Sequence, residues 1–585
     1  MAQQQRQEPM SLTGRLILTG LLAWGAVRSG PPMIGDQWQP LSAALHGLTF
    51  LVGFPLIGIA LKSFAHLLDW TSAHTPTGKD GTARWAKWQD IKRELTREHA
   101  GPFWGLAAFK GKVALFIDFA SNALCIAPAG SGKGIYTVVT NIMSILASKI
   151  IVDFKGELIC ITKPLLEARG ERVICLNPFG LWATIIGHSE MYNPVDIVTQ
   201  SLYRPGYLFL AVSDAVEMAK NRLPEPPEGQ GETFWREGAR QIIAFTLLLE
   251  VMVEGYKATL ASVALLIEDR RALEDNLRWV LGLDLEGKPL PEGPMPIERA
   301  PWAELHEPQD VQAFAHFIRA RASRLLALMK DNARTFESFA SNAQQVLAPF
   351  AVGALAKATS QSTFSMDDLK DPDRPASLFI VVDSSRNVAS EAYVNITQWA
   401  LIATIKRNPH KHVPVYGIFD EATNYRIPDF ADLMTFGRGY GFRSLVIFQD
   451  LSAFERVYGK QALETLLSET EVKQFLPGQR SPKTLELISK LLGEQSVMAA
   501  GKSVQEDGVR EQLSETARPL MTPDEIRRSP YGLLMVRQHP PVLVEPISYA
   551  EIHPWRKQAG INPFHGRPFL KKVRLRLRTP KGGKP

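Results

Sequence analysis

The feature that most constrains the fold is a glycine-rich loop between a short apolar strand and an apolar helix. The strand is expected over residues 123–127 and the helix over residues 135–146, with Pro-Ala-Gly-Ser-Gly-Lys-Gly between them. This order is the context that a phosphate-binding P-loop requires. Backbone N–H groups of the loop would converge on phosphates, helped by the positive end of the helix dipole. The loop residues expected to bind a nucleotide are Pro128, Ala129, Gly130, Ser131, Gly132, Lys133 and Gly134.

The residues of this loop have different expected roles. Gly130 and Gly132 permit a close approach of the backbone, and Lys133 would reach the β- and γ-phosphates. The loop departs from the general pattern at two positions, because Ala127 replaces the first glycine and Gly134 stands where a Ser or Thr hydroxyl normally binds Mg²⁺. A glycine-rich turn can contain Gly-Ser-Gly-Lys by chance, so a nucleotide site requires a second motif.

The second motif follows a β-prone apolar run, 413–419, which ends in Asp420 and Glu421. A strand that delivers two carboxylates at its carboxyl end is the Walker B arrangement. Asp420 would hold Mg²⁺ through water, and Glu421 would polarise the attacking water. A further strand, 444–448, ends in Gln449, which can sense the γ-phosphate from the neighbouring strand end. We therefore predict a P-loop ATPase with ATP and Mg²⁺ as its ligands.

The distance between the two motifs predicts an inserted domain. Lys133 and Asp420 are 287 positions apart, which is more than a minimal P-loop core needs. Residues 202 to about 350 have a mainly helical pattern, interrupted by Pro-rich loops. The expected helices cover residues 234–249, 261–280 and 311–329, and a strand over 377–382 marks the return to the sheet. The predicted fold class is an α/β motor core interrupted by an all-α domain.

Two apolar segments precede this core. Residues 41–61 contain no Lys, Arg, Asp or Glu, and at about 1.5 Å per residue they match the ~30 Å hydrocarbon layer of a bilayer. An earlier apolar run, 16–27, could belong to a signal peptide, but no small-residue cleavage pattern follows it. Basic residues flank the pair on both sides, so the positive-inside rule places both flanks in the cytoplasm. We predict two transmembrane helices, about 12–30 and 41–61; two buried core helices are the alternative.

Composition excludes other classes of protein. Hydrophobic residues make up 45% and charged residues 22% of the 585 residues, which excludes a disordered chain. The three cysteines are irregularly spaced without a CxxC motif, which argues against a disulfide framework or a zinc site.

The net charge of +6 is a property of the C-terminal tail. Residues 552–585 contain ten Lys or Arg and no acid. An extended chain over 573–578 would place three arginines on one face. This pattern suits contact with DNA phosphates or anionic lipid headgroups, whereas a solvated tail without a partner is the alternative.

Several segments, taken in order, resemble the type IV coupling proteins, the TraG/TraD-like ATPases of conjugative DNA transfer. The resemblance runs from about residue 80 to 550 and is specific because the motifs recur in order. In that family a Gly after the P-loop Lys is common. The similar segments are Gly81-Thr-Ala-Arg-Trp-Ala86, the P-loop, Ile151-Val-Asp-Phe-Lys-Gly-Glu157, Leu176-Asn-Pro178, Tyr192-Asn-Pro194, Phe419-Asp-Glu-Ala-Thr-Asn424, Gly437-Arg-Gly-Tyr-Gly441 with Gln449, and residues 514–526.

The resemblance implies a two-helix anchor in the bacterial inner (cytoplasmic) membrane, a RecA-like motor domain and an all-α domain facing the cytoplasm. It also implies a homo-oligomer, a hexameric ring that binds ATP between subunits. Such a ring would thread single- or double-stranded DNA, or a relaxase–DNA complex, into a type IV secretion channel. An arginine would reach the neighbour's nucleotide; Arg438 and Arg443 are the candidates, with a structural salt bridge as the alternative role of each.

The expected domains are the membrane anchor (1–70), two parts of the motor domain (71–200 and 351–550), the all-α domain (201–350) and the basic tail (551–585). Two other functions stay open. One is a nucleotide-binding membrane scaffold that recruits protein substrates to a secretion system; Glu421 argues against it, because a scaffold needs no catalytic carboxylate. The other is a chromosome-type DNA translocase, which usually has more membrane spans, a long linker and a winged-helix tail.

Overall fold

The computed structural model describes most of the chain after residue 75. The described residues are 76–96, 100–108, 112–225, 233–291, 296–408, 410, 412–427, 429–505, 508–566 and 571–577. They belong to two compact units. The smaller unit contains the described residues up to Ala83 together with Leu492–Leu520, and the larger unit contains Arg84–Leu491 and Met521 onward.

The smaller unit is a β-hairpin with one additional chain segment beside it. Strands β10 (Glu494–Gln505) and β11 (Gly508–Pro519) pair antiparallel along their whole length. The additional segment is bonded to the base of the hairpin, where Ala83 N donates to Glu494 O at 2.9 Å. The Glu515 carboxylate accepts hydrogen bonds from Thr77 Oγ1 and Gly78 N, and these bonds lower its pKa to about 2.

The larger unit is built on one sheet of eleven strands, ordered β2-β1-β13-β12-β9-β3-β8-β7-β4-β6-β5. From β9 to β5 every neighbouring pair is parallel, and the strands from β12 to β2 continue the sheet antiparallel. The parallel strands are β9 (Thr470–Phe475), β3 (Asn122–Ile126), β8 (Phe442–Phe448), β7 (Val415–Phe419), β4 (Ser148–Asp153), β6 (Ala376–Val381) and β5 (Arg172–Leu176). The antiparallel strands are β12 (Gly532–Val536), β13 (Val542–Glu545), β1 (Phe103–Ala107) and β2 (Ala114–Phe116).

Most of the parallel strands are buried on both faces. Every residue of β3, β4, β6 and β7 is buried, which explains their continuous apolar runs. Alternate residues such as Ala123 and Cys125 of β3 join one core with the helices that follow β3 and β4. These helices are η3 (Gly134–Val138), which is one π-helical turn, α4 (Val139–Ser144) and α5 (Glu157–Ala168).

Further short and long helices complete the sheet region. They are α3 (Trp88–Ile91), α6 (Ala183–Ile186), α15 (Asn387–Arg407), α16 (Phe430–Phe436), η8 (Gly437–Tyr440), α17 (Leu451–Tyr458), α18 (Lys460–Glu469), α19 (Pro482–Leu492), α20 (Pro523–Arg528), η9 (Tyr549–Glu551) and α21 (Trp555–Gln558). The strands predicted before the P-loop, before Asp420 and before Gln449 are confirmed as β3, β7 and β8.

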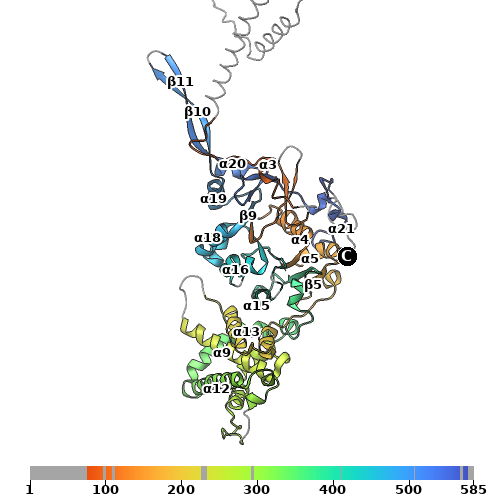
Figure 1. Ribbon diagram of the computed structural model, residues 1–585, viewed down its shortest axis with the longest axis vertical. Helices are drawn as coiled ribbons and strands as arrows, with labels where there is room; N and C mark the ends of the chain where they lie inside the picture. Colours follow the sequence, from red (N-terminus) through yellow and green to blue (C-terminus); the bar gives the residue numbers. More distant parts are fainter. Residues whose placement is uncertain are drawn as a thin grey trace, which may run out of the picture. The chain divides into compact units, whose positions relative to one another are not determined.

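The helical insertion lies between β5 and β6, which are neighbours in the sheet. Figure 1 shows α9, α12 and α13 gathered together at one end of the larger unit, beyond the strands. The insertion contains α7 (Asp196–Tyr203), α8 (Leu208–Arg222), α9 (Thr233–Glu254), η4 (Gly255–Lys257), α10 (Leu260–Glu268), α11 (Arg270–Leu281), η5 (Pro296–Arg299), η6 (Ala303–Leu305), α12 (Pro308–Asp331), α13 (Ala333–Ala351), α14 (Ala354–Ala358) and η7 (Met366–Lys370).

One helix of the insertion is shorter than predicted. The apolar pattern over 261–280 predicts a continuous helix, but the chain forms α10 and α11 with Asp269 between them. The Asp269 carboxylate accepts from the backbone N–H groups of Arg271 and Ala272, both at 3.0 Å. Asp269 is therefore the N-cap of a new helix.

Polar contacts join the insertion to the sheet region. Arg426, in the loop after β7, donates to the main-chain carbonyl of Glu225 at 2.8 Å. The Glu225 carboxylate is paired with Arg236 at 3.0 Å and Arg240 at 2.6 Å, both on α9. Buried Arg222, at the end of α8, donates to Ala392 O of α15 at 3.1 Å. The loop that carries Asp420 and Glu421 is thus connected to α9.

The C-terminal segment lies on the larger unit. Strand β15 (Leu575–Arg576) pairs parallel with β14 (Ile552–His553). Arg574, one of the three arginines that the extended-tail pattern places on a shared face, forms ion pairs with Glu545 and Glu551. Part of the basic tail is therefore engaged with acidic residues of its own chain.

The predicted localisation requires a correction. In the part of the chain from residue 76 onward that the structure describes, no helix is both long and apolar enough to cross a bilayer. The long helices α9, α12 and α15 carry charged residues along their lengths, and charged side chains are costly in a hydrocarbon layer. A multi-pass protein of the bacterial inner membrane is not supported by this finding. The predicted spans, about 12–30 and 41–61, lie outside the described residues.

Candidate functional site

The predicted site residues lie at one edge of the sheet, where the parallel strands end. The glycine loop follows β3, Asp420 and Glu421 follow β7, and Gln449 follows β8. Strand β8 lies between β3 and β7 and pairs with both. Because the carboxyl ends of parallel strands meet at a common edge, segments more than 280 positions apart are brought together there.

The glycine loop has an open backbone. Gly130 and Gly132 have φ values of +80° and +78°, a conformation that favours glycine. A Cβ atom at Gly130 or Gly134 would meet nothing within 4 Å, whereas one at Gly132 would lie 2.4 Å from the Tyr136 ring. Among the described residues, the N–H groups of Gly130, Gly132 and Lys133 have no hydrogen-bond acceptor. These donors, beside the first helical turn, suit an anionic ligand.

Lys133 joins the glycine loop to the carboxylate pair. Its Nζ lies 3.1 Å from Asp420 Oδ1 and 2.9 Å from Glu421 Oε1. Burial lowers the pKa of Lys133, but the two carboxylates outweigh this effect and the pKa is raised. Burial raises the pKa of Asp420, although Lys133 opposes that change. The structure therefore brings the three predicted residues into direct contact.

Glu421 is held from two sides. Its Oε2 accepts a hydrogen bond from Asn424 Nδ2 at 2.5 Å, while Oε1 faces Lys133. Its φ of +52° lies in the left-handed region, where a residue with a side chain is strained. Such strain is found at functional sites because the surrounding contacts maintain it. Asn424 was not among the predicted site residues; its position three residues after Glu421 was the available signal.

Gln449 lies beside the start of the glycine loop. It follows the last residue of β8, and Ala127 N donates to Phe448 O at 2.9 Å. Gln449 is half-buried, and its side chain makes no hydrogen bond within the described residues. Its position at the neighbouring strand end agrees with the one expected for a residue that faces a terminal phosphate.

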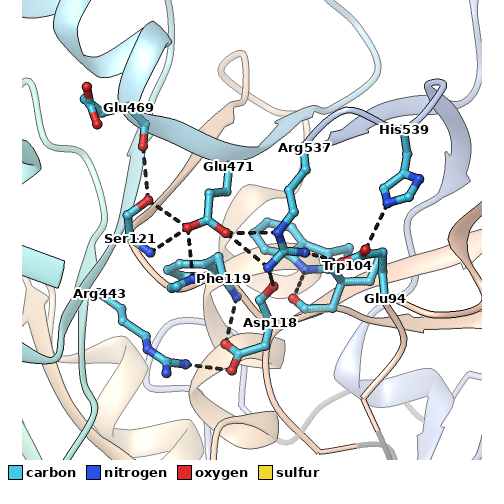
Figure 2. A network of polar contacts seen from close by, with 12 residues as sticks. Glu94, Trp104, Asp118, Phe119, Ser121, Arg443, Glu469, Glu471, Arg537 and His539 are labelled. Atoms are coloured by element: carbon cyan, nitrogen blue, oxygen red, sulfur yellow. Dashed lines mark hydrogen bonds and ion pairs between the residues drawn. The ribbon is translucent and has the colours of Figure 1, made fainter. Parts of the chain in front are cut away.

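The structure distinguishes the two candidate arginines. Arg438 lies in η8, is exposed, and has no ion pair in the described part of the chain. Arg443 lies near the amino end of β8, where it pairs with Asp118 at 2.6 Å and donates to Tyr416 Oη at 2.5 Å. Figure 2 shows Arg443 pointing toward Asp118. Arg443 is thus engaged within its own chain, and Arg438 is free to reach another molecule.

The contacts of Arg443 belong to a larger polar network at the amino ends of the strands. Glu471 of β9 accepts from Ser121 N at 3.0 Å and is paired with Arg537, which also contacts Glu94 (Figure 2). Arg537 Nη2 additionally donates to the main-chain carbonyl of Asp118 at 3.0 Å. The network ties the segment before β3 to β9 and to the residue that follows β12.

A cavity of about 190 Å³ opens beside Lys133 and contains residues that the sequence did not single out as site residues. Besides Lys133, Asp420 and Glu421, its charged lining residues are Asp153, Lys155 and Glu157, which lie at or after the end of β4. Burial raises the pKa of Asp153 to about 6, although backbone N–H groups of Ile159 and Lys155 donate to it. The available signals were their position at a strand end, as for Asp420, and the resemblance of the segment Ile151-Val-Asp-Phe-Lys-Gly-Glu157 to the coupling-protein family.

Comparison with known proteins agrees with this architecture. The model of the family described as "Type IV secretory system Conjugative DNA transfer" matches residues 78–554. The chain is 25% identical over 434 residues to conjugal transfer protein TraG of Escherichia coli, covering 70% of this chain and 62% of that protein. It is 23% identical over 506 residues to protein VirD4 of Agrobacterium fabrum, covering 80% and 65%. The chain thus spans less than two thirds of the length of these relatives.

Solved structures of a conjugative coupling protein have a similar fold. One is the plasmid coupling protein TrwB in complex with ADPNP, with a TM-score of 0.52, 16% identity, and coverage of 80% of this chain and 97% of that chain. Another is TrwB in complex with sulphate, with a TM-score of 0.52, 17% identity and the same coverage. At these identities the likeness concerns the RecA-like α/β fold. Since the family model matches most of its residues, this chain belongs to the type IV secretory system conjugative DNA transfer family.

Proposed function

We propose that this protein is a P-loop ATPase that couples ATP hydrolysis to the transfer of DNA, or of a relaxase–DNA complex, into a type IV secretion channel. The observation that carries the proposal is the contact of Lys133 with Asp420 and Glu421, which joins a glycine loop to two carboxylates from another strand. The transport function is supported by the family match. TrwB, which has a similar fold, was solved with ADP and Mg²⁺ and with ADPNP.

The residues present fit a magnesium-bound nucleoside triphosphate. Three backbone N–H groups of the loop have no acceptor among the described residues, and the Ser131 hydroxyl is buried without a hydrogen-bond partner there. Asp420 would hold Mg²⁺, which neutralises charge on the β- and γ-phosphates when it is bound. Gly134 supplies no hydroxyl for the metal, so its remaining ligands are phosphate oxygens, water or a hydroxyl from elsewhere.

The contacts of Lys133 define how the site would respond to a phosphate. Its ammonium group is shared between Asp420 and Glu421, and a phosphate oxygen would compete with these carboxylates for it. Glu421 would then orient the attacking water, with Asn424 holding its second oxygen. Gln449 would face the terminal phosphate from the neighbouring strand end.

We further propose that the chain works as a homo-oligomeric ring, a hexamer, in which Arg438 reaches the nucleotide of the adjacent copy. Arg438 is exposed and unpaired in the described residues. Phe436, two positions earlier, is 61% exposed and would supply apolar contact area beside it. Arg443 does not serve this role, because Asp118 and Tyr416 hold it.

The test is ATP hydrolysis by the full-length protein, measured with and without single- and double-stranded DNA. We expect hydrolysis that DNA stimulates and that Lys133→Ala abolishes together with nucleotide binding. Nucleotide binding without hydrolysis under any of these conditions would contradict the proposal and favour a nucleotide-binding scaffold for protein substrates. Hydrolysis that responds to a protein substrate but not to DNA would retain the ATPase and change its cargo.

A further inference from the structure

The loop that follows β4 forms one wall of the cavity beside Lys133. Phe154 and Lys155 of this loop, and Glu157 at the start of α5, line the cavity together with Asp420 and Glu421. Strand β4 is the neighbour of β7 on the side away from β3. The β4 loop therefore faces the glycine loop across the two carboxylates.

The backbone of this loop is fixed at Lys155, whose main-chain N–H and C=O groups are both hydrogen-bonded. Asp153 Oδ1 accepts from Lys155 N at 3.2 Å, and Trp182 Nε1 donates to Lys155 O at 2.7 Å. The adjacent Gly156 has a φ of +66°, and a Cβ atom there would lie 2.7 Å from Trp182 Cδ1. Asp153 Oδ2 also accepts from Ile159 N at 3.0 Å, which ties the loop to the first turn of α5. The backbone of Lys155 is thus held in place at the wall of the cavity, and its exposed side chain starts from a defined position.

The ammonium group of Lys155 has no ion pair within the described residues, although acidic residues surround the cavity. Glu157, two residues along, accepts a hydrogen bond from Asn562 Nδ2 of the C-terminal segment. Asp420 and Glu421 are both engaged by Lys133. Lys155 is therefore exposed, positioned and available for an anion.

The charges of the cavity favour such a role. The charged groups that line it are four carboxylates, namely Asp153, Glu157, Asp420 and Glu421, and the two lysines. Without Lys155, the four carboxylates and Lys133 would leave the cavity lining at −3, and a bound Mg²⁺ would reduce this only to −1. A triphosphate that enters the cavity would then meet an excess of negative charge. A second cation next to the carboxylates would lower that repulsion where the phosphate charge is greatest.

We propose that Lys155 is a second phosphate-binding cation of this site, which contacts the terminal phosphate and gives the site a preference for nucleoside triphosphates over diphosphates. Lys133 approaches the phosphates from the glycine loop, and Lys155 approaches from the opposite wall. The phosphate between the two lysines is the one beside Asp420 and Glu421, which is the terminal one. This inference rests on the proposed nucleotide site and adds a residue and a selectivity to it.

The test is equilibrium binding of ADPNP and of ADP, each with Mg²⁺, to the full-length protein and to Lys155→Gln. A charge-assisted hydrogen bond to a phosphate corresponds to about a ten- to hundredfold change in affinity. We expect Lys155→Gln to raise the Kd of ADPNP about tenfold or more and to leave the Kd of ADP within about twofold. Lys155→Arg should restore most of the affinity for ADPNP, because it keeps the charge.

Lys357→Gln is the matched control, because Lys357 is an exposed lysine of α14 outside the cavity. It should change neither Kd. Unchanged binding of both nucleotides to Lys155→Gln, or an equal loss of both, would overturn the inference. Lys133→Ala shows whether such a result contradicts only the role of Lys155 or the proposed nucleotide site as a whole. If Lys133→Ala loses nucleotide while Lys155→Gln does not, only the role of Lys155 is wrong; if Lys133→Ala binds both nucleotides normally, the proposed site itself is wrong.

Discussion

The parallel strands carry a cluster of charged side chains at each end, and the two clusters are built differently. At the amino ends, Arg443 pairs with Asp118, and Arg537 pairs with Glu94 and Glu471. At the carboxyl ends, four carboxylates and two lysines line one cavity, and backbone N–H groups of the glycine loop have no acceptor in the described part of the chain. A cluster that satisfies its own charges ties structural elements together, whereas one with unmatched charges and donors is suited to bind a ligand.

The largest expected effect is that of Glu421→Gln, in the carboxyl-end cluster, on the rate of ATP hydrolysis. The substitution keeps the size of the side chain and removes the charge that would orient the attacking water, which is worth about 10²–10⁴-fold in rate. We expect kcat for ATP hydrolysis to fall by that factor, while nucleotide affinity and the midpoint of thermal unfolding stay close to those of the parent protein. Lys133→Ala should instead lose nucleotide binding. Equal nucleotide affinities for the two variants would show that their roles are wrongly assigned.

Arg537→Gln tests the amino-end cluster. It removes a cation shared between Glu94 and Glu471 and leaves both partly buried carboxylates without it. We expect a loss of stability of about 1–2 kcal/mol, discounted because the site is partly exposed, with the Kd of ADPNP unchanged. Urea unfolding and nucleotide titration measure the two effects. Arg374→Gln, at an exposed arginine without an ion pair in the described residues, is the control. A large change in nucleotide affinity would mean that the two ends of the strands are coupled.

Asn424→Ala tests whether the hydrogen bond from Asn424 orients the Glu421 carboxylate for catalysis. The substitution removes the donor that holds Glu421 Oε2, so the carboxylate would be less well oriented toward the water. We expect kcat to fall about tenfold, corresponding to the loss of one hydrogen bond, with little change in KM. Thr423→Ala in the same loop should have no effect. If KM changes and kcat does not, Asn424 acts on nucleotide binding.

The smallest expected effect concerns pH. Burial raises the pKa of Asp153 to about 6, whereas an Asp in an unfolded chain titrates near 3.9. Between these values the folded protein binds the additional proton, so stability should decrease as the pH rises from about 4 to about 6. Backbone N–H groups that donate to Asp153 favour its charged form and therefore oppose the effect of burial. Urea unfolding at pH 4, 5, 6 and 7 should show this slope in the parent protein, and a slope that persists in Asp153→Asn would contradict the assignment.

The parts of the fold that end in chemical motifs were predictable from the sequence. The glycine loop, the Asp420-Glu421 pair and Gln449 each mark where a buried strand ends, so β3, β7 and β8 were located to within a few residues. The wide spacing of Lys133 and Asp420 predicted an insertion, and the chain between β5 and β6 contains helices. The break at Asp269 was missed, although the sequence changes there from the apolar α10 to the charged, amphipathic α11 and Asp is a favoured N-cap residue.

Features that depend on pairing between distant segments were not predictable. The pairing of β13 with β1 and of β12 with β9 depends on register between segments far apart in the sequence. The hairpin β10–β11 is local, since Gln505 pairs with Gly508, but it was not predicted. Asp153 and Lys155 enter the site only because β4 lies next to β7. Similarly, Arg438 and Arg443 are equivalent in the sequence, and only the position of Asp118 shows that Arg443 is committed to its own chain.

The hydrogen bond from Arg426 to the main-chain carbonyl of Glu225 has a mechanical consequence. Arg426 lies five residues after Glu421, and Glu225 in turn holds Arg236 and Arg240 of the 22-residue helix α9. A helix is stiff, and one of 22 residues extends about 33 Å. A small tilt imposed at the Arg426 end would therefore become a larger displacement at the far end of α9. The insertion is connected in this way to the loop that would orient the attacking water, so a displacement of that loop would be passed to α9.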